Sequence, residues 1–553
     1  MVNPLKISFK VVFLAIFFLN LLVYHNAFHP GLRYDCPEIY KPAELPTFKD
    51  RVKFAFLANG KGDPVSTKFS WFRPVPFLIS WEFFRAVDRQ PEKVNLFNVL
   101  ILSVFGFILF RFLLFLFNLP VLALVSALLF CLHPVNVIWV NYPPGGVHGF
   151  FVFGLMIAAM YAFFLYARDD RSIGMYFFSL FLFSLALLSH EIAIFLPLSM
   201  ALTIHCLLMK DRRRAYFSLV GFVVLAAAYL WVRSSVLPKR DSAMQKMAEA
   251  GVDWLTYGGS LVKVFIIYLG KLVSLQGIVI NWCEPFLKTN VWPWLFLGGV
   301  LLCVFISLIV SRRQGIVTWA LGLLFVGFIP VCAGGMLVPK EGLIYESHWL
   351  LFTSIGFFVL FGLMIDRLYS HWRRLAVGVM ICLVMFWVNV AWQYNRLYSD
   401  ELRYALYYRD NAPGFRVAHI FVFQAYYNIG KLREAREALT GAFRGDKKDR
   451  AVYVYAAFVD TAMGEYARAE DSLLKSISLD PHNPPAKTLL GFIYGNRGDY
   501  AKAQKLYDDV AKIDPLCEEG GRFAYSFADL GQEENAVLMD ESCRKIRESH
   551  KAL

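Results

Sequence analysis

Four glycines near the C-terminus recur at an almost constant interval. They are separated by 34, 34 and 33 residues, and an alanine stands five residues after each one. The set consists of Gly430, Gly464, Gly498 and Gly531 with Ala435, Ala469, Ala503 and Ala536. Glycine can take the backbone conformation that turns a chain between two helices, and alanine lets two helices pack closely. This period therefore predicts a short solenoid of helix pairs.

The sequence around these glycines repeats as well as their spacing. The strings that begin at them read GKLREA, GEYARA, GDYAKA and GQEENA. Pro481 and Pro515 each lie 17 residues after a glycine, where the second helix of a pair would end. This pattern resembles the tetratricopeptide (TPR) repeat. The resemblance implies that the tail binds a peptide or protein and that its concave face is the binding surface.

The chain before the solenoid is strongly apolar. Over the whole chain 57% of the residues are hydrophobic and 18% are charged. Apolar stretches of about 16–22 residues recur, and a helix needs roughly 20 residues to cross a bilayer. Residues 1–400 are therefore predicted to form a polytopic membrane domain and residues 401–553 the solenoid, so the fold class is all-α. Eleven spans are predicted, at residues 9–24, 96–117, 120–131, 147–165, 173–188, 192–209, 216–232, 291–310, 316–331, 349–365 and 376–392.

The charge distribution orients these spans. The net charge is +13, but from residue 415 onward 20 Lys and Arg balance 21 Asp and Glu, so the membrane domain carries the excess. This favours anionic lipid over nucleic acid as a partner and predicts basic cytoplasmic loops. The basic loops lie around Arg168, Arg212, Arg312 and Arg373. All four loops are cytoplasmic only if segment 254–276 does not cross the membrane, but lies along the membrane interface or enters and leaves the membrane on the same side. The solenoid then lies outside the cytoplasm.

Sequon and cysteine usage bear on the compartment. No Asn-x-Ser/Thr sequon occurs, which favours a bacterial inner membrane with the solenoid in the periplasm or outside. The nine cysteines include no CxxC pair, and most lie in apolar spans. They are interpreted as small core residues, not as a metal site or a disulfide framework. Cys517 and Cys543 could still pair across the solenoid.

The predicted topology gathers polar residues at the outer membrane face. The loop of residues 26–95 lies there, with Asp35, Glu38 and Arg73. Other polar residues stand at the outer ends of spans, namely His133, His148, His190, Glu191, Arg233, Glu346 and His348. Polar residues gathered at one face of a membrane protein indicate a site, although span ends are also where polar residues ordinarily lie.

Seven strings in a fixed order carry a second resemblance. They are LRYDCPEIY, WFRPVPFLISW, VNLFNVLI, ALLFCLHPVNVIWV, LLSHEIAIFLPL, AYLWVRSSV and YESHWLLFTSIGFF, and the TPR repeats follow the last span. This order resembles the membrane glycosyltransferases of the GT-C fold, in particular the transmembrane-and-TPR protein O-mannosyltransferases and their bacterial relatives. The resemblance implies an integral membrane enzyme that transfers a sugar from a polyprenyl-phosphate donor to a protein acceptor docked by the TPR repeats.

The sequence departs from the motifs of that family. The family's acidic pair is reduced to Asp35 followed by Cys36, and the lysine of its Ser-Lys-Glu motif is His190. Its late motif reads Glu-Ser-His at residues 346–348 and continues with apolar residues. Two alternatives therefore stay open. One is a ligase or polymerase that uses a lipid-pyrophosphate oligosaccharide, and the other is a non-catalytic membrane scaffold that presents the TPR repeats.

Sugar transfer from a polyprenyl phosphate needs a base for the acceptor's proton, and cations or a metal at the departing phosphate. Position and resemblance assign the base to Asp35, with Glu38 as a second carboxylate and Glu191 as a further catalytic residue. Arg73 and Arg233 are predicted to hold the donor phosphate. The remaining candidates for donor binding are His190, Glu346 and His348. A divalent metal, Mg or Mn, held by Asp35 and Glu191 is an alternative source of positive charge, and no other cofactor is predicted.

Overall fold

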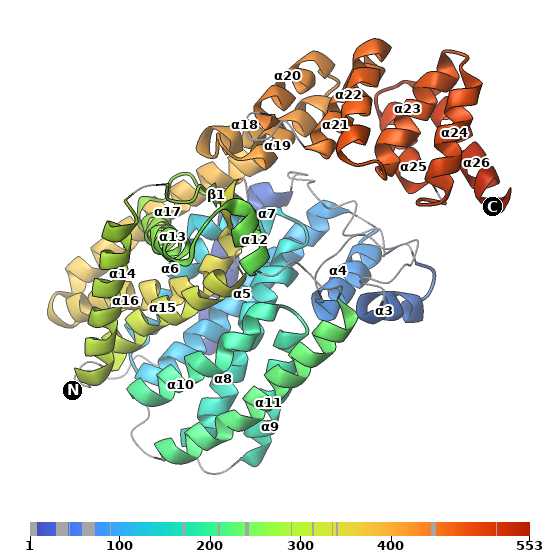
Figure 1. Cartoon of the computed structure of the whole chain (residues 1–553). Helices are drawn as coiled ribbons and strands as arrows, with labels where there is room; N and C mark the ends of the chain where they lie inside the picture. The colour runs from blue at the N-terminus through green and yellow to red at the C-terminus, as the bar shows by residue number, and fades with distance from the viewer. Residues whose placement is uncertain are drawn as a thin grey trace. The chain divides into compact units, whose positions relative to one another are not determined.

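The computed structural model of the chain describes residues 8–28, 43, 45–57, 72–88, 90–168, 172–207, 211–237, 243–288, 290–311, 315–334, 336–338, 341–443, 449–515 and 517–552. The chain divides into two compact units, Met1–Glu401 and Leu402–Leu553. Both are built almost entirely of helices, which confirms the all-α fold class (Figure 1).

Unit 1 combines long apolar helices with short connecting segments and one small sheet. The long helices are α1 (Phe9–Val23), α5 (Pro91–Phe117), α6 (Pro120–Leu132), α8 (Val152–Arg168), α9 (Ile173–Leu187), α10 (Leu196–Leu207), α11 (Arg212–Val236), α13 (Trp254–Ser274), α14 (Val291–Ser311), α15 (Gly315–Gly334), α16 (Leu350–His371) and α17 (Arg373–Tyr398). The short segments are η1 (His25–Phe28), α3 (Phe48–Leu57), α4 (Pro74–Ala86), η3 (Pro134–Asn136), α7 (Val137–Asn141), η4 (Val147–Phe151), η5 (Glu191–Phe195), α12 (Ala243–Ala250) and η6 (Ser347–Trp349).

Proline and asparagine mark helix ends in unit 1. Helices α4, α5 and α6 each carry a proline in their first turn, where the missing N–H costs no hydrogen bond. Helix α5 ends at Asn118, which has φ +54° and donates its backbone N–H to the Leu114 carbonyl. Asparagine tolerates this left-handed conformation, and Pro120 starts α6 two residues later. The chain therefore reverses between α5 and α6 within a few residues.

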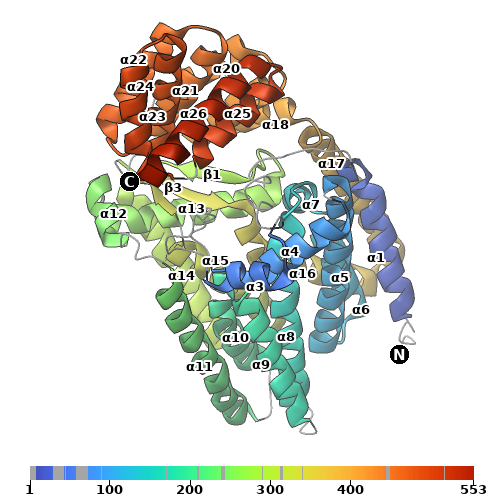
Figure 2. The same cartoon turned by 90° about the vertical axis from the view of Figure 1, so that its right-hand side faces the viewer.

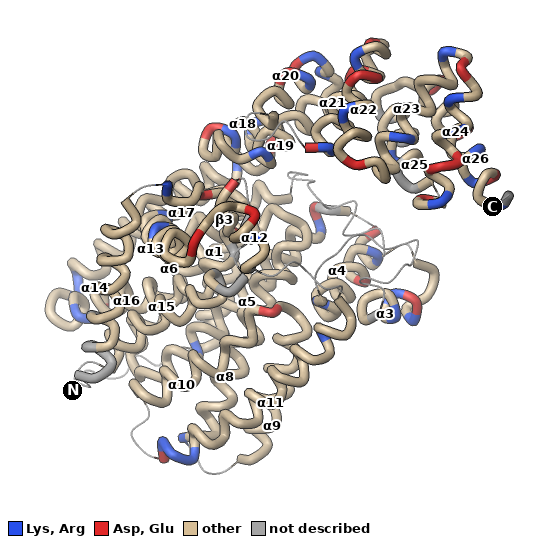
Figure 3. Tube along the Cα trace, in the orientation of Figure 1, with Lys and Arg blue, Asp and Glu red and all other residues tan. Residues whose placement is uncertain are grey.

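Among the described residues of unit 1, six helices are long and apolar enough to cross a membrane, or seven if the bent pair Pro120–Leu132 and Pro134–Asn141 forms one span. Five shorter apolar helices lie in the same unit. Each predicted span falls on one of the long helices, on the bent pair or on a shorter apolar helix, and the number of eleven spans stays a prediction. Figure 3 places the Lys, Arg, Asp and Glu of unit 1 mostly at helix ends and leaves the middle of the long helices largely without charged residues.

Helix α13 passes the length test for a span, yet it lies crosswise to the other long helices. It is seen nearly end-on in Figure 1, and in Figure 2 it lies transverse to the direction of α8 and α9. Its two lysines have partners: Lys263 lies 2.8 Å from Glu284, and Lys271 donates to the Gln276 and Gly277 carbonyls. A crosswise amphipathic helix with paired lysines fits the predicted interfacial segment better than a span.

A three-stranded antiparallel sheet lies beside α13, in the order β1 (Asn281–Glu284), β3 (Gly342–Glu346), β2 (Met336–Val338). In its register Ile344 faces both Cys283 and Met336. The hydroxyl of Tyr268 on α13 donates to the backbone carbonyl of Glu346 at 2.8 Å. The sheet thus fixes the chain that leads from β3 into η6, where the late motif of residues 346–348 begins.

Buried polar side chains join the long helices. Asn20 on α1 donates to Ser103 on α5 at 3.0 Å, and Trp319 on α15 donates to Thr203 on α10 at 2.8 Å. His133, fully buried after α6, accepts from the Val135 N–H at 3.1 Å and lies 3.2 Å from the Leu272 carbonyl of α13. Hydrogen bonds between helices stabilise bundles in apolar surroundings. His133 therefore shapes the turn after α6 and ties it to α13.

Unit 2 begins within α18 (Glu401–Asn411) and continues as four helix pairs. They are α19 (Arg416–Asn428) with α20 (Leu432–Ala442), α21 (Arg450–Ala462) with α22 (Tyr466–Leu479), α23 (Pro484–Asn496) with α24 (Tyr500–Ala511), and α25 (Glu518–Asp529) with α26 (Glu533–Ala552). The four repeat glycines have φ between +71° and +82° and stand at the turn within each pair. The four repeat alanines are buried. The predicted solenoid of helix pairs is therefore confirmed.

The first helix of the last pair packs against the first helices of the other three. The Tyr427 hydroxyl on α19 donates to the Ser526 carbonyl on α25 at 2.6 Å. The ring of Phe527 on α25 lies 4.9 Å from Phe458 on α21 and 5.6 Å from Phe492 on α23. First helices line the concave side of a TPR stack, so α25 fills the side on which the sequence predicts a binding surface.

Cys517 and Cys543 form a disulfide, with their Cα atoms 5.4 Å apart. The bond joins the residue before α25 to the middle of α26. The interpretation of the cysteines as unpaired core residues is therefore wrong for this pair, since residues 26 positions apart are brought together only by the helix turn. The other described cysteines are free, namely Cys131, Cys206, Cys283, Cys303, Cys332 and Cys382.

Candidate functional site

Arg73 and Glu191, predicted from separate motifs, form a two-pronged ion pair. Nε and Nη2 of Arg73 donate to the two carboxylate oxygens of Glu191 at 3.0 and 2.9 Å. The Arg73 side chain is 13% exposed and that of Glu191 is 31% exposed. Next to them, the Val75 N–H donates to the Leu188 carbonyl at 3.3 Å. The start of α4 is therefore joined to the turn between α9 and α10 by side chains and by backbone.

His190 holds the turn from which Glu191 projects. It is buried, and its Nδ1 accepts from the Ile192 N–H at 3.1 Å, which caps η5. His133 caps η3 in the same way. The same Nδ1 of His190 lies 3.6 Å from the Glu191 carboxylate. These contacts assign His190 a positioning role beside Glu191, and its predicted contact with the lipid donor stays a prediction.

Tyr229 and Arg233 bring α11 to the same place. The Tyr229 hydroxyl donates to the Phe72 carbonyl at 3.4 Å, and the two rings lie 6.1 Å apart. Arg233, one turn later on α11, lies within electrostatic range of that hydroxyl, and so do Arg73 and Glu191. The Nε of Arg233 is buried and, among the described residues, has no hydrogen-bond partner. Helix α11 therefore brings a second guanidinium, with a buried Nε–H, to Tyr229.

The ion pair sets the charge states of Arg73 and Glu191. Burial alone would raise the pKa of the Glu191 carboxyl, but Arg73 and His190 outweigh it and hold that pKa well below its usual range. Burial would lower the pKa of Arg73, while Glu191 and, more weakly, Glu346 raise it. Both groups are therefore charged at neutral pH. An ionised Glu191 with both oxygens occupied can orient Arg73, but it is a poor proton acceptor.

We expect acid to destabilise the protein through Glu191. The interactions that lower the pKa of Glu191 stabilise the fold in full at pH values above 4.5, which is the ordinary pKa of the carboxyl. This stabilisation is lost as the pH falls through the lower pKa of the folded state. Glu191→Gln should therefore flatten the dependence of melting temperature on pH below about pH 4. At neutral pH it should cost roughly 1–3 kcal/mol, less than for a fully buried pair.

Melting curves of the full chain in detergent between pH 3 and 7 measure this effect. Glu249→Gln on the exposed face of α12 is the matched control, because it removes a carboxylate without a partner of this kind. If Glu191→Gln and wild type lose stability in parallel at low pH, the ion pair does not control the acid response.

The other predicted site residues are placed as follows. Asp35 and Glu38 lie outside the described residues, as does the side chain of His348. Glu346 lies at the end of β3, close enough to Arg73 to raise the pKa of that guanidinium. Among the described residues, no group of three His, Cys, Asp or Glu side chains could hold a metal. Both oxygens of Glu191 are engaged by Arg73, so this carboxylate does not fit a metal ligand in this arrangement.

Tyr229 is the member of the cluster that sequence reasoning missed. Its position four residues before Arg233 on a helix was the available signal, because side chains at i and i+4 share a face. Tyrosine is also common where a helix leaves the hydrocarbon region, with its ring in apolar surroundings and its hydroxyl at a polar partner. The pair Tyr229 and Arg233 could therefore have been selected together.

The comparisons with known proteins concern the solenoid. Residues 460–522 match the tetratricopeptide repeat family, which confirms the TPR prediction. Two crystal structures of MamA are similar at 20% identity, covering 28% and 27% of this chain and 90% and 83% of those chains, each with a TM-score of 0.21. The APC/C hetero-tetramer Cut9–Hcn1 is similar at 14% identity over 85% of this chain and 80% of that chain, with a TM-score of 0.22.

TM-scores this low carry no argument about the fold. No curated protein matches the chain. The TPR match and the four helix pairs identify unit 2 as a repeat module of the kind that binds other proteins.

Proposed function

We propose that the chain is an integral membrane glycosyltransferase that moves a sugar from a polyprenyl-phosphate donor to a protein acceptor held by unit 2. The observation that carries the proposal is the cluster of Arg73, Glu191, Tyr229 and Arg233, which three distant segments build together. Two of its members are guanidinium groups. Guanidinium is the side chain best suited to phosphate, because its planar donors match the oxygens of the anion.

The cluster is preorganised for charge that develops on a leaving phosphate. Glu191 holds the Arg73 guanidinium in one orientation, and the Arg233 guanidinium lies within electrostatic range of Tyr229 with its Nε unpartnered among the described residues. Fixed donors stabilise a transition-state anion without reorganisation, and in many enzymes this electrostatic stabilisation contributes most of the rate enhancement. In this scheme Glu191 is a positioning residue, and the base that accepts the acceptor's proton is Asp35 in the outer loop.

Two further observations support a site at the extracytoplasmic face of the membrane. Helix α11 exposes large apolar side chains along its length, including Val220, Val223 and Trp231, which offer a surface for a lipid tail. The disulfide in unit 2 favours an oxidising compartment, because cytoplasmic thiols are kept reduced in most organisms. Both agree with a bacterial inner membrane in which unit 2 faces the periplasm.

A non-catalytic scaffold remains the second candidate. Its support is the TPR match together with the departures from the GT-C motifs at Asp35 and His190. A lipid-pyrophosphate donor would use the same cluster, because both donors present a phosphate beside a lipid tail. Donor specificity must therefore be read from an assay.

The assay combines the purified full chain with a panel of acceptor peptides that carry Ser and Thr hydroxyls and a panel of synthetic polyprenyl-phosphate and polyprenyl-pyrophosphate sugars, and it measures transfer to the peptide and release of the lipid phosphate. We expect turnover with a monophosphate donor, and Asp35→Asn should lower it by about 10²–10⁴ because it removes the general base. Asp88→Asn is the matched control, since Asp88 is exposed and has a left-handed φ of +55°, which asparagine tolerates. Absence of turnover with every donor would favour the scaffold.

A further inference from the structure

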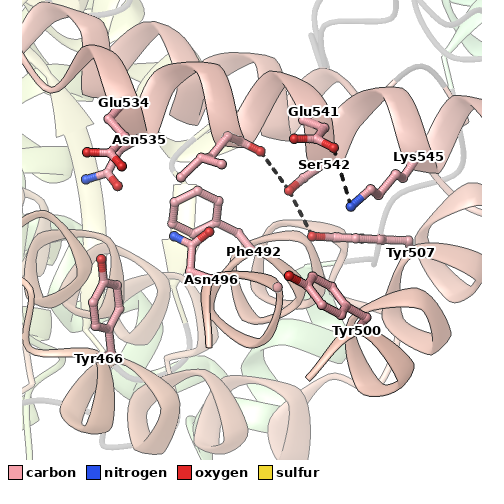
Figure 4. Close-up of a pocket in the computed structure, with 12 residues that line it drawn as sticks. Tyr466, Phe492, Asn496, Tyr500, Tyr507, Glu534, Asn535, Glu541, Ser542 and Lys545 are labelled. Atoms are coloured by element: carbon pink, nitrogen blue, oxygen red, sulfur yellow. Dashed lines mark hydrogen bonds and ion pairs between the residues drawn. The ribbon is translucent and has the colours of Figure 1, made fainter. Parts of the chain in front are cut away.

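Unit 2 contains a pocket of about 470 Å³ that is lined by residues of α22, α23, α24 and α26. One wall is α26, and the opposite wall is made by α22, α24 and the end of α23 (Figure 4). A hollow of this size is within the range of binding pockets for small ligands or side chains. Its lining is rich in tyrosine and carries two glutamates and one lysine.

The polar groups at one end of this pocket satisfy one another. The Tyr507 hydroxyl donates to Ser542 Oγ at 2.8 Å, and Ser542 donates to the Leu538 carbonyl at 3.0 Å. Lys545 Nζ lies 3.7 Å from the Glu541 carboxylate and 5.9 Å from the centre of the Tyr500 ring. This end therefore has a balanced charge and already holds a cation over an aromatic ring.

The other end repeats the aromatic and acidic groups without a cation. Tyr466, Asn496 and Glu534 come from α22, α23 and α26, and Figure 4 shows their side chains converging on the hollow. Within the part of the chain that the structure describes, none of these three side chains has a hydrogen bond or ion pair. One carboxylate, one amide and one phenol ring are thus available at the same place.

We propose that this end of the pocket binds an arginine side chain in an exposed segment of the partner protein. A guanidinium can stack on the Tyr466 ring while it donates to the Glu534 carboxylate and the Asn496 amide oxygen. Lysine has fewer directed donors and stacks less well, and an acidic side chain would meet Glu534 and Glu541. The inference names the partner chemistry of the protein-binding unit and does not depend on sugar transfer.

The disulfide supports the pocket by fixing the wall that carries Glu534. Helix α26 contributes half of the lining residues, and Cys543 directly follows Ser542, which is bonded to Tyr507. Helix α26 is therefore held at neighbouring residues by a disulfide to the segment before α25 and by a hydrogen bond to α24. Because the backbone of α26 is already held in place, binding of a ligand to the Glu534 carboxylate does not require this helix to become ordered first.

The test measures binding of the full chain to labelled twelve-residue peptides of Gly and Ser with one central Arg, Gln or Glu. We expect the Arg peptide to bind at least tenfold more tightly than the Gln peptide, and the Glu peptide to bind more weakly still. Glu534→Gln should remove the preference for Arg. Glu533→Gln should keep it, because Glu533 lies in the same first turn of α26 but does not line the pocket.

Tyr466→Leu, which keeps the apolar bulk, should weaken Arg binding severalfold through loss of stacking. Equal affinity for the Arg and Gln peptides, or unchanged Arg binding by Glu534→Gln, would overturn the proposal. Binding of a neutral oligosaccharide that Glu534→Gln abolishes, without discrimination between the peptides, would assign the pocket to a sugar instead. Release of lipid phosphate by Glu534→Gln is measured in parallel, so that failure of the pocket and failure of the enzymatic proposal are told apart.

Discussion

Replacing Arg233 with methionine is expected to lower the rate of lipid-phosphate release by about 10²–10³ while the protein stays folded. The physical reason is that Arg233 Nε is buried and has no hydrogen-bond partner among the described residues, while Arg233 and the Arg73–Glu191 pair both lie within electrostatic range of Tyr229. A donor in that state is stabilised by an arriving anion and most of all by the charge that develops on a leaving phosphate. Methionine keeps the apolar stem of the side chain, so packing on α11 changes little.

Two variants make this experiment specific. Arg213→Met removes an exposed arginine from the first turn of α11 and should leave the rate unchanged. Arg233→Lys keeps the charge but loses the planar donors, and an intermediate rate is expected. Donor binding measured separately distinguishes loss of affinity from loss of the chemical step. If Arg233→Met releases phosphate at the wild-type rate, the cluster is not the site of sugar transfer.

The repeat in the tail was predictable because local backbone chemistry dictates it. Gly430 and its three equivalents stand at positions with φ above +70°, where a side chain would be strained, and Ala435 and its equivalents stand where a larger side chain would separate two helices. The same requirements recur in every helix pair of the solenoid, so the residues that meet them recur at a constant interval in the sequence. The apolar helices of unit 1 were predictable for a similar reason, since each carries its own hydrophobic signal.

The sequence predicted that Arg73, Glu191 and Arg233 lie at the same face of the membrane, but it did not predict which of them are in contact. Their contact depends on how the start of α4 packs against η5 and α11, and no local pattern specifies that packing. The spacing of Tyr229 to Arg233 was a local signal, but the contact of its hydroxyl with Phe72 spans 157 positions of the chain and leaves no such signal. Sequence reasoning also missed that α25 packs against the first helices of the other pairs. The repeat pattern defines each helix pair, but it does not define how the last pair is placed against the earlier ones.

Breaking the Cys517–Cys543 bond is expected to lower the stability of the last helix pair by about 3 kcal/mol. The bond closes a loop between residues 26 positions apart, and its loss restores conformational freedom to the unfolded chain. Hydrogen exchange of the full chain should show faster exchange in α25 and α26 for the variant with both cysteines replaced by serine, and little change in α19 to α22. Cys382→Ser, at an exposed free cysteine in unit 1, is the matched control.

The oxidation state of this pair in intact cells also tests the compartment. Cells quenched with acid and treated with a maleimide reagent should yield a chain in which Cys517 and Cys543 are protected until a reductant is added. Since cytoplasmic thiols are kept reduced in most organisms, protection indicates that unit 2 folds outside the cytoplasm. Full labelling of both residues in cells would place unit 2 in a reducing compartment. A lipid-linked sugar donor at the outer face could then not supply an acceptor held by unit 2, and the scaffold would become the better explanation of the chain.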